Sequence, residues 1–344
     1  MLEHILKEAV CQNASDVHIK AGGVPVFRIN GVLNRQNLSA VSENAITSFI
    51  EQYGTCAVNE TEVDFCCCIA GAGSFRVHGY LQNGFPALAV RIIKSAVPSL
   101  SDLNAPPVLG KLAMQRSGLI LVTGPAGSGK STTLAAMVDF INRNKSAHIV
   151  TLEDPPEYRF TEDKSIISQR QVGSDTASFA LGLRAALRQD PDVIMIGELR
   201  DAQTAAGAVS AAETGHLVLA TLHTCSAVLA VSRMLDFFAP EKQQQMRAQL
   251  AENLQAVIAQ QLVPGCHGGR TAAFEVLTFT QAVRSLLRDG KAHQLASYMQ
   301  SGRQQGMQCM DYALAYLART GAITKQTAQE YAFDIDLLNK YLLQ

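Results

Sequence analysis

The chain has 344 residues, 47% of them hydrophobic and 17% charged, and its formal net charge at pH 7 is −1. This length allows two domains with substantial cores. The near-neutral charge gives no indication of binding to nucleic acid or to an anionic membrane surface. No apolar run approaches the roughly 18 residues of a transmembrane helix, and the start, MLEHILKEAV, lacks the basic-then-apolar order of a signal peptide. We expect a cytoplasmic protein.

Residues 1–97 predict a small α+β domain, and the Pro- and Ser-rich segment 98–107 predicts a linker. Within this domain, turn signals at Asn30-Gly31 and Asn83-Gly84 separate strand-like runs. The eight cysteines are irregularly spaced, which favours free thiols over a disulfide framework or a zinc ribbon. Three of them, Cys66, Cys67 and Cys68, lie in one strand-like run, where neighbours alternate faces and cannot converge on one metal. We interpret them as small buried hydrophobic residues.

The pattern changes after the linker. Across 108–270, the short apolar runs GLILVT, HIVTLE, DVIMIGE and HLVLATL alternate with helical segments. Such runs suit strands of a parallel sheet buried on both faces, so the alternation predicts an α/β core. Beyond about residue 240 the pattern is helical, apart from the strand-like RTAAFEVL, and residues 271–344 are expected to be mostly helical.

A phosphate-binding loop follows the first of these runs. GPAGSGKST fits G-x-x-x-x-G-K-[ST] between a predicted strand and a predicted helix, the context that supports a P-loop. Its glycines let backbone N–H groups face an anion, Lys130 adds a full charge for the phosphates, and the Ser131 hydroxyl can bind Mg²⁺. The sequence therefore predicts a nucleoside triphosphate site made by Gly124, Pro125, Ala126, Gly127, Ser128, Gly129, Lys130, Ser131 and Thr132.

Carboxylates follow two other predicted strands. Ligands of parallel sheets lie beyond the carboxyl ends of the strands, where Glu153 and Glu198 are expected. We interpret them as a catalytic pair, one to activate water and one, with Ser131, to hold the magnesium shell. In a general P-loop template the acidic residue directly follows four apolar residues, whereas here Gly197 intervenes before Glu198, so the division of roles between the two stays open. Asp154 and Glu157 are secondary candidates.

Two histidines flank the last strand-like run. In an extended backbone, His216 and His223 lie roughly 23 Å apart and point to opposite faces, so they cannot form one site. His223, at the carboxyl end, is predicted to sense the terminal phosphate, and His216 to make structural or subunit contacts. Arg184 and Arg188 are four residues apart, which predicts one shared helix face. They either pair with acidic neighbours or reach a phosphate across an interface.

Together, GPAGSGKSTTLAAM, TLEDPPEY, LRAALRQDPDVIMIGELRDAQT and AAETGHLVLATLHT resemble the Walker A, Asp box, Walker B and His box of the type II/type IV secretion ATPase superfamily. The similarity is greatest to its type IV pilus retraction ATPases. The resemblance implies a homohexamer whose subunits join a PAS-like N-terminal domain to a RecA-like P-loop domain, with ATP and Mg²⁺ as cofactors. It also implies that Arg76 and Arg91 reach the phosphates from the N-terminal domain.

The implied function is ATP hydrolysis that drives pilus retraction and twitching motility at the cytoplasmic face of the inner membrane. The implied partners are an inner-membrane platform protein and a second pilus ATPase, with peripheral membrane association only and no nucleic acid. Two alternatives stay open: a pilus assembly or type II secretion ATPase, and an accessory ring subunit. AVRSLLRDGK resembles a helical motif of the retraction branch. We expect its Leu286 and Leu287 to pack inward, and Arg284 and Arg288 to face outward for coupling to partners.

Overall fold

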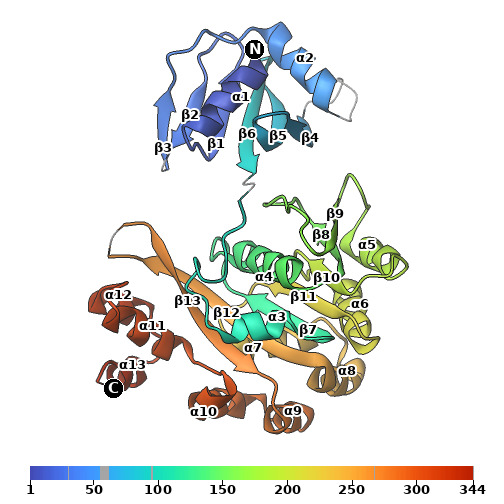
Figure 1. Cartoon of the computed structure of the whole chain (residues 1–344), viewed down its shortest axis with the longest axis vertical. Coiled ribbons are helices and arrows are strands. Elements are labelled where there is room, and N and C mark those ends of the chain that lie inside the picture. Colours follow the sequence, from blue (N-terminus) through green and yellow to red (C-terminus); the bar gives the residue numbers. More distant parts are fainter. Residues whose placement is uncertain (30, 55–61, 94–95, 267, 344) are drawn as a thin grey trace. The chain divides into compact units, whose positions relative to one another are not determined.

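The computed structural model describes residues 1–344 except 30, 55–61, 94–95, 267 and 344 (Figure 1). The chain forms two compact units. One comprises Met1–Ala96 with Glu157–Arg159, and the other comprises Val97–Pro156 with Phe160–Gln344. The domain divisions placed at 97, 107 and 270 stay predictions.

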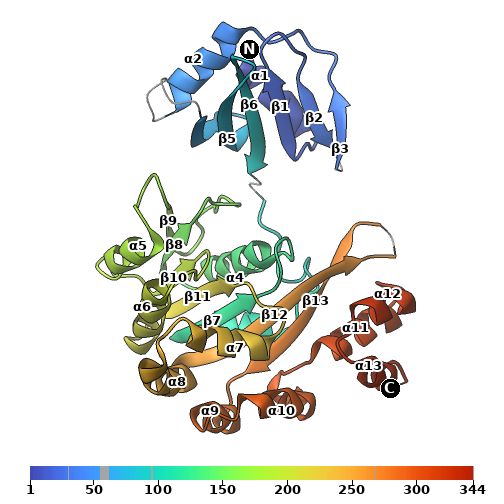
Figure 2. The same cartoon turned by 180° about the vertical axis from the view of Figure 1, so that it is seen from behind.

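The N-terminal unit is an antiparallel sheet with two helices packed on one face (Figures 1 and 2). Its strand order is β3-β2-β1-β6-β5-β4. The elements are α1 (Leu2–Cys11), β1 (Asp16–Lys20), β2 (Val26–Ile29), β3 (Val32–Arg35), α2 (Glu43–Tyr53), β4 (Glu62–Ile69), β5 (Gly73–Gln82) and β6 (Phe85–Ile93).

Alternation along these strands separates an apolar face from a polar one. On β1, Val17 and Ile19 are buried under the helices, whereas Asp16 and His18 belong to the opposite face. The predicted turn at Asn83-Gly84 is confirmed, since both residues have the positive φ values, 54° and 82°, that a tight hairpin turn requires. The other predicted turn joins β2 to β3, and its Asn30 lies outside the described residues.

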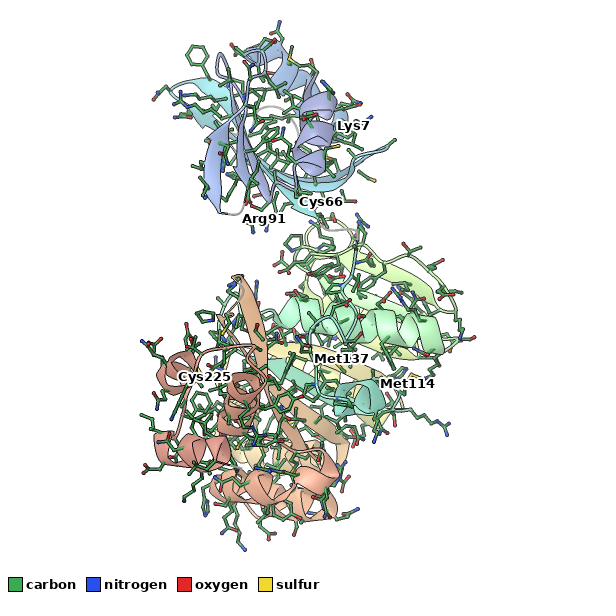
Figure 3. All side chains as sticks on the ribbon, turned by 60° about the vertical axis from the view of Figure 1, so that its left-hand side comes forward. Lys7, Cys66, Arg91, Met114, Met137 and Cys225 are labelled. Atoms are coloured by element: carbon green, nitrogen blue, oxygen red, sulfur yellow. The ribbon has the colours of Figure 1, made fainter. Side chains whose placement is uncertain are left out.

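The three consecutive cysteines lie on β4, as predicted, but only one of them is buried. Cys67 points into the core and is 8% exposed, and burial raises the pKa of its thiol to about 12. Cys66 (labelled in Figure 3) is half-buried and Cys68 is exposed, because neighbours on a strand alternate faces. The interpretation of all three as buried residues was therefore wrong. The seven cysteines among the described residues are free thiols, and Cys56 lies outside them.

The second unit is built on a seven-stranded sheet of order β13-β12-β7-β11-β10-β8-β9. All neighbouring strands are parallel except β12 and β13. The strands and the helices that connect them are α3 (Val108–Ala113), β7 (Gly118–Thr123), α4 (Lys130–Asn144), β8 (His148–Glu153), β9 (Ile166–Gln171), α5 (Phe179–Ala186), β10 (Val193–Ile196), α6 (Ala202–Glu213), β11 (Leu217–Leu222), α7 (Ala227–Asp236), α8 (Pro240–Asn253), β12 (Leu254–Pro264) and β13 (Arg270–Thr278). After the sheet come α9 (Gln281–Arg288), α10 (Leu295–Ser301), α11 (Met310–Arg319), α12 (Lys325–Tyr331) and α13 (Ile335–Leu342).

Helices cover both faces of this sheet (Figures 1 and 2). On β7, Ile120 and Val122 pack against α3 and α4, including Met137 (Figure 3), whereas Leu119 and Leu121 face the core formed with α5 to α8. Burial on both faces explains why the strands read as continuous apolar runs. The predicted α/β class, with a PAS-like and a RecA-like part, is confirmed by the structural similarity described below.

One strand of this sheet contradicts the sequence interpretation. Residues 254–264, expected to be helical, form β12, which pairs with β7 on one side and β13 on the other. Its apolar residues Leu254, Val257, Ile258 and Leu262 recur at spacings typical of a helix, because both faces are buried and no alternation marks the strand. β13 joins the same sheet and runs to Thr278, past the division placed at 270. Within the described residues, no helix has the length and apolar character needed to cross a membrane.

Candidate nucleotide site

The P-loop connects β7 to α4 and is shaped by three glycines with positive φ. Gly124 has φ +153°, and a Cβ there would lie 2.4 Å from the backbone oxygen of Gln260 and 2.5 Å from Ser128 Oγ. Gly127 and Gly129 have φ values of +73° and +87°. Gly129 is the N-cap of α4, where no side chain caps the first turn. The loop thus presents an uncapped helix N-terminus, which attracts anions.

Lys130 lies at the start of α4 and reaches back across the loop. Its Nζ donates hydrogen bonds of 2.9 Å to the carbonyl oxygens of Gly124 and Pro125, and it is 8% exposed. The Ser128 hydroxyl is buried and has no hydrogen-bond partner among the described residues. A buried cation and a buried hydroxyl beside glycine amides are groups that the phosphates of a nucleotide can satisfy. The loop therefore fits the predicted ligand.

A chain of polar contacts runs from Lys130 along the carboxyl edge of the sheet. Lys130 Nζ lies 3.4 Å from His223 Nδ1, and His223 Nε2 lies 3.0 Å from Glu198 Oε1. The other oxygen of Glu198 accepts a 2.7 Å hydrogen bond from Arg200 Nε, and Arg200 NH1 lies 3.3 Å from Asp154 Oδ2. The bond to Glu198 raises the pKa of the Arg200 guanidinium. Both oxygens of Glu198 are thus held by neighbours.

Glu198 lies two residues beyond β10, and Gly197 explains how it gets there. The Gly197 N–H donates to Leu152 O at 2.7 Å, and a Cβ on Gly197 would come within 3.2 Å of that same oxygen. A larger residue would need a shift of a few tenths of an ångström at this point. The glycine before the acidic residue therefore favours the close approach of this segment to β8.

Glu153 ends β8, which is the parallel neighbour of β10. Its Oε1 accepts hydrogen bonds from Thr151 Oγ1 at 2.7 Å and from Gln169 Nε2 at 3.0 Å, and it is 8% exposed. Both carboxylates lie at the carboxyl edge of the sheet, each fixed by a different set of partners. Their catalytic pairing stays a prediction.

The donors needed for Mg²⁺ are available at this edge. Ser131 lies in the first turn of α4, and Glu198 follows β10 at the same edge of the sheet. Among the described residues, no group of three or more His, Cys, Asp or Glu side chains is arranged to hold a metal by itself. Nucleotide-bound Mg²⁺ takes most of its ligands from phosphate and water, so one hydroxyl and one or two carboxylates suffice.

The two histidines lie at opposite ends of β11. His216 precedes the strand, and its Nδ1 lies 2.9 Å from Ala211 O and 3.2 Å from Thr214 Oγ1, at the end of α6. His223 follows the strand, 49% exposed at the side chain, within the polar chain described above. Only His223 is therefore brought to the P-loop.

Two other sets of candidates lie away from these contacts. Arg184 is exposed on α5, and the helix ends at Ala186, so Arg188 lies in the following turn and the prediction of one shared helix face was wrong. Within the described residues, neither arginine forms an ion pair, nor does Glu157, which is exposed.

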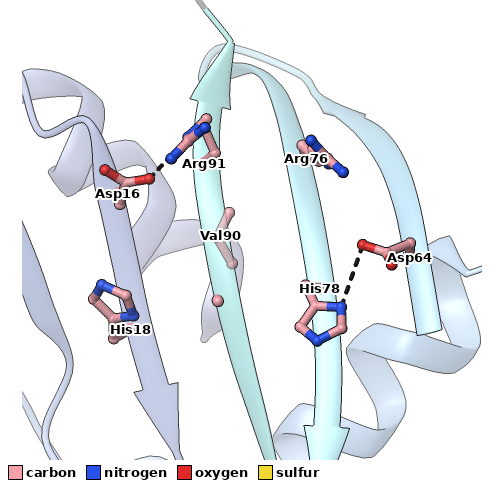
Figure 4. Close-up of a pocket in the computed structure, with 8 residues that line it drawn as sticks. Asp16, His18, Asp64, Arg76, His78, Val90 and Arg91 are labelled. Atoms are coloured by element: carbon pink, nitrogen blue, oxygen red, sulfur yellow. Dashed lines mark hydrogen bonds and ion pairs between the residues drawn. The ribbon is translucent and has the colours of Figure 1, made fainter. Parts of the chain in front are cut away.

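Arg76 and Arg91 lie side by side on the polar face of the N-terminal sheet (Figure 4). Arg91 is paired in register with Asp16, and its Nε lies 2.9 Å from Asp16 Oδ1. Burial raises the pKa of Asp16, but hydrogen bonds from Ser15 and Arg91 outweigh this effect and place the pKa below its ordinary value. A pocket of about 330 Å³ here is lined by Asp16, His18, Asp64, Arg76, His78, Ala89, Val90 and Arg91.

On α9, Arg284 and Arg288 have different surroundings. Arg284 was expected to face outward, but its NH1 donates to Ala251 O at 2.6 Å and its NH2 to Gln255 Oε1 at 3.2 Å. It therefore caps the C-terminal end of α8, where carbonyl groups lack helical partners. Arg288 is exposed, as expected. Leu287 is buried and Leu286 only partly buried.

The sequence interpretation missed three residues of this site. Arg200, two positions after Glu198, is exposed in a loop and carried no pattern of its own. Gln260 lies on the unpredicted strand β12, where its Oε1 accepts a 2.7 Å hydrogen bond from Thr133 Oγ1 behind the P-loop. Thr224 hydrogen-bonds Thr123 through its backbone N–H at 2.9 Å, which joins the loop after β11 to the end of β7.

Comparisons with known proteins agree with this geometry. A family model described as type II/IV secretion system protein matches residues 86–330. The chain is 40% identical over 336 residues to the type IV pilus retraction ATPase PilT of Pseudomonas aeruginosa, covering 96% of this chain and 98% of the relative. It is also 40% identical over 336 residues to the type IV pilus ATPase PilU of that organism, covering 96% and 88%. The crystal structure of the pilus retraction motor PilT with bound ADP matches with a TM-score of 0.90 at 41% identity, covering 98% of this chain and 99% of that one.

Proposed function

Because the chain belongs to the type II/IV secretion system protein family, as its four sequence motifs predicted, we propose that it is a hexameric ATPase motor that drives type IV pilus retraction. The observation that carries this proposal is the contact chain from Lys130 through His223 to Glu198, at the uncapped N-terminus of α4. It places a cation, a histidine and a carboxylate at one phosphate-binding loop.

Each of these groups has a role that its position supports. Lys130, now bonded to two loop carbonyls, exchanges those partners for phosphate oxygens when ATP binds. Glu198 orients and polarises the attacking water, and Glu153 or Glu198 helps to hold the hydrated metal with the Ser131 hydroxyl. When bound, Mg²⁺ would neutralise part of the negative charge on the phosphates.

His223 links the two ends of this chain, because it lies between Lys130 and Glu198. When Lys130 turns toward phosphate, the neighbour of His223 Nδ1 changes, and the imidazole passes that change on to the carboxylate that it contacts. We therefore assign His223 as the sensor of the terminal phosphate.

The N-terminal unit contributes cations to the same reaction. Arg76 and Arg91 complete the phosphate site within the hexamer, and the Asp16 carboxylate holds Arg91 until then. Domain closure around ATP thus couples chemistry to movement. The motor works at the cytoplasmic face of the inner membrane on a pilus platform protein, with a second pilus ATPase as a further partner.

Assays on the purified protein test whether it is a hexameric ATPase. We expect a hexamer by native mass spectrometry and Mg²⁺-dependent ATP hydrolysis that Lys130→Ala and Glu198→Gln each reduce at least about 100-fold. Arg143→Ala, an exposed change that removes an ion pair with Asp139, is the control and should leave hydrolysis unchanged. Equal activity in all four proteins would contradict the assignment.

A deletion strain tests the direction of the motor. Surplus surface pili with lost twitching motility support retraction, whereas cells without pili indicate an assembly motor. The chain is 40% identical both to PilT and to a second pilus ATPase, PilU, so one further candidate is an accessory subunit beside another retraction ATPase. A purified protein without hydrolysis, whose deletion leaves some retraction, supports that alternative.

A further inference from the structure

A buried carboxylate on β13 accepts hydrogen bonds from the first backbone N–H groups of two helices. Glu275 is 3% exposed. Its Oε1 accepts a 2.7 Å hydrogen bond from the Ala227 N–H, the first residue of α7, and its Oε2 accepts a 3.3 Å bond from the Met310 N–H, the first residue of α11. Burial raises the pKa of Glu275 above its ordinary value, and the two backbone hydrogen bonds offset only part of this increase. An acidic side chain in a strand core is unusual and costs free energy, so its placement calls for an explanation.

One of these bonds fixes the segment that carries His223. Ala227 lies four residues beyond His223, and between them Thr224 is bonded to Thr123 at the end of β7. Glu275 and Thr123 lie in one row across the sheet, since each is paired in register with Ala259 of β12. The loop after β11 is thus attached to the sheet at two points, beside the P-loop strand and at β13.

The other bond leads into the C-terminal helices. Met310 begins α11, and the next residue, Asp311, is 4% exposed. Asp311 Oδ1 accepts hydrogen bonds from the N–H groups of Phe333 at 2.8 Å and Asp334 at 3.2 Å, at the start of α13. Glu275 therefore hydrogen-bonds the first residues of both α7 and α11.

We propose that Glu275 is a positioning residue that fixes His223 against Glu198 and transmits displacement of the C-terminal helices to it. The inference rests on the proposed ATPase. A shift of α11 changes the hydrogen bond at Oε2, and the rigid carboxylate passes that shift to Oε1 and to the start of α7. The helices that follow the sheet thereby influence hydrolysis without touching the nucleotide.

Glu275→Gln tests the proposal in the full-length hexamer. Glutamine can accept from only one of the two amides, and its NH₂ group faces the other. We expect kcat to fall about tenfold while KM for ATP stays within about twofold, because the P-loop is held separately through Gln260 and Thr133. In a His223→Ala background the same substitution should cost less than about twofold further, because both changes disturb one unit.

Asn142→Ala is the matched control. It removes a buried side chain whose Oδ1 accepts hydrogen bonds from the N–H groups of Asp163 and Ser165, and these bonds involve neither α7 nor α11. We expect a similar loss of thermal stability and a kcat within about twofold of the parent. Equal kcat losses in E275Q and N142A, or an undiminished E275Q effect in the His223→Ala background, would overturn the proposal. If E275Q does not fold, Glu275→Asp, which shortens the side chain by one methylene, should give the same loss of kcat with KM retained, and an unchanged kcat there would overturn it equally.

Discussion

The Nε2 atom of His223 lies 3.0 Å from Oε1 of Glu198, although the two residues are 25 positions apart in the sequence. Each follows the carboxyl end of a strand, β11 and β10, and these strands are parallel neighbours. Because parallel strands end at the same edge of a sheet, the loops that follow them meet there. The imidazole thereby contacts both Lys130 and the carboxylate of Glu198.

His223→Ala should therefore reduce kcat by about 100-fold or more, since it removes a group that contacts the carboxylate in the chemical step. His216→Ala should leave kcat within about twofold, because the His216 side chain hydrogen-bonds Ala211 and Thr214 at the far end of β11 from the P-loop. Steady-state ATP hydrolysis by the two purified variants makes the comparison. Equal and severe losses of kcat would show that the two histidines do not have separate roles.

Arg200 should also influence hydrolysis, through the 2.7 Å bond that its Nε donates to Glu198 Oε2. Arg200→Ala frees that oxygen, so we expect kcat to fall about tenfold with thermal stability nearly unchanged, because the arginine side chain is 55% exposed. Asp154→Asn removes the charge from the second partner of Arg200 and should change kcat by less than about twofold. An Arg200→Ala enzyme with the parent kcat would mean that His223 alone orients the carboxylate.

The P-loop requires glycine more strictly at position 124 than at position 127. In Gly124→Ala, the new Cβ would lie 2.4 Å from a backbone oxygen, so the loop must move and we expect ADP binding to weaken at least about 100-fold. In Gly127→Ala, no atom lies within 4 Å of the new Cβ, and only the left-handed backbone opposes it, at about 1–2 kcal/mol. Titration calorimetry with ADP compares the two. Equal weakening would show that loop strain, not the contact with Gln260, sets the requirement.

Much of the ATPase core follows from local sequence. The predicted helix KSTTLAAMVDFINRN is α4 from its first residue to its last, because a P-loop fixes its start and an apolar face its length. The carboxyl-end rule also placed His223 and Glu198 at one edge. These features depend on contacts close in the chain or on the general geometry of parallel sheets.

The errors come from residues whose surroundings are formed by distant segments. β12 has no alternating pattern, because β7 and β13 flank it and helices cover both of its faces. Glu275 is one acidic residue in an apolar run, and its two partners come from helices that begin 48 residues before and 35 residues after it. Arg284 looked like an outward charge, since the end of α8 that it caps is 32 positions away. Local periodicity carries no information about such partners.

Because Arg284 is bonded to the end of α8 and Arg288 is exposed, the two arginines should be tested separately for coupling to partners. Arg288 is exposed and forms no ion pair among the described residues, so Arg288→Ala should leave the folded hexamer and its ATP hydrolysis within about twofold of the parent. We expect the same variant to lose pilus retraction, measured as twitching on a surface, if α9 transmits motion to the pilus machinery. Normal twitching would remove Arg288 from the coupling surface.

Arg284→Ala serves as the stability comparison for that experiment. It removes the charged hydrogen bonds to Ala251 O and Gln255 Oε1, and the C-terminal carbonyls of α8 lose their partner. We expect the free energy of unfolding to drop by about 1–3 kcal/mol, seen as a lower melting temperature that Arg288→Ala does not share. A loss of twitching in Arg284→Ala alone, with its melting temperature lowered, would reflect the weakened end of α8, whereas an unchanged melting temperature would show that the cap contributes nothing to stability.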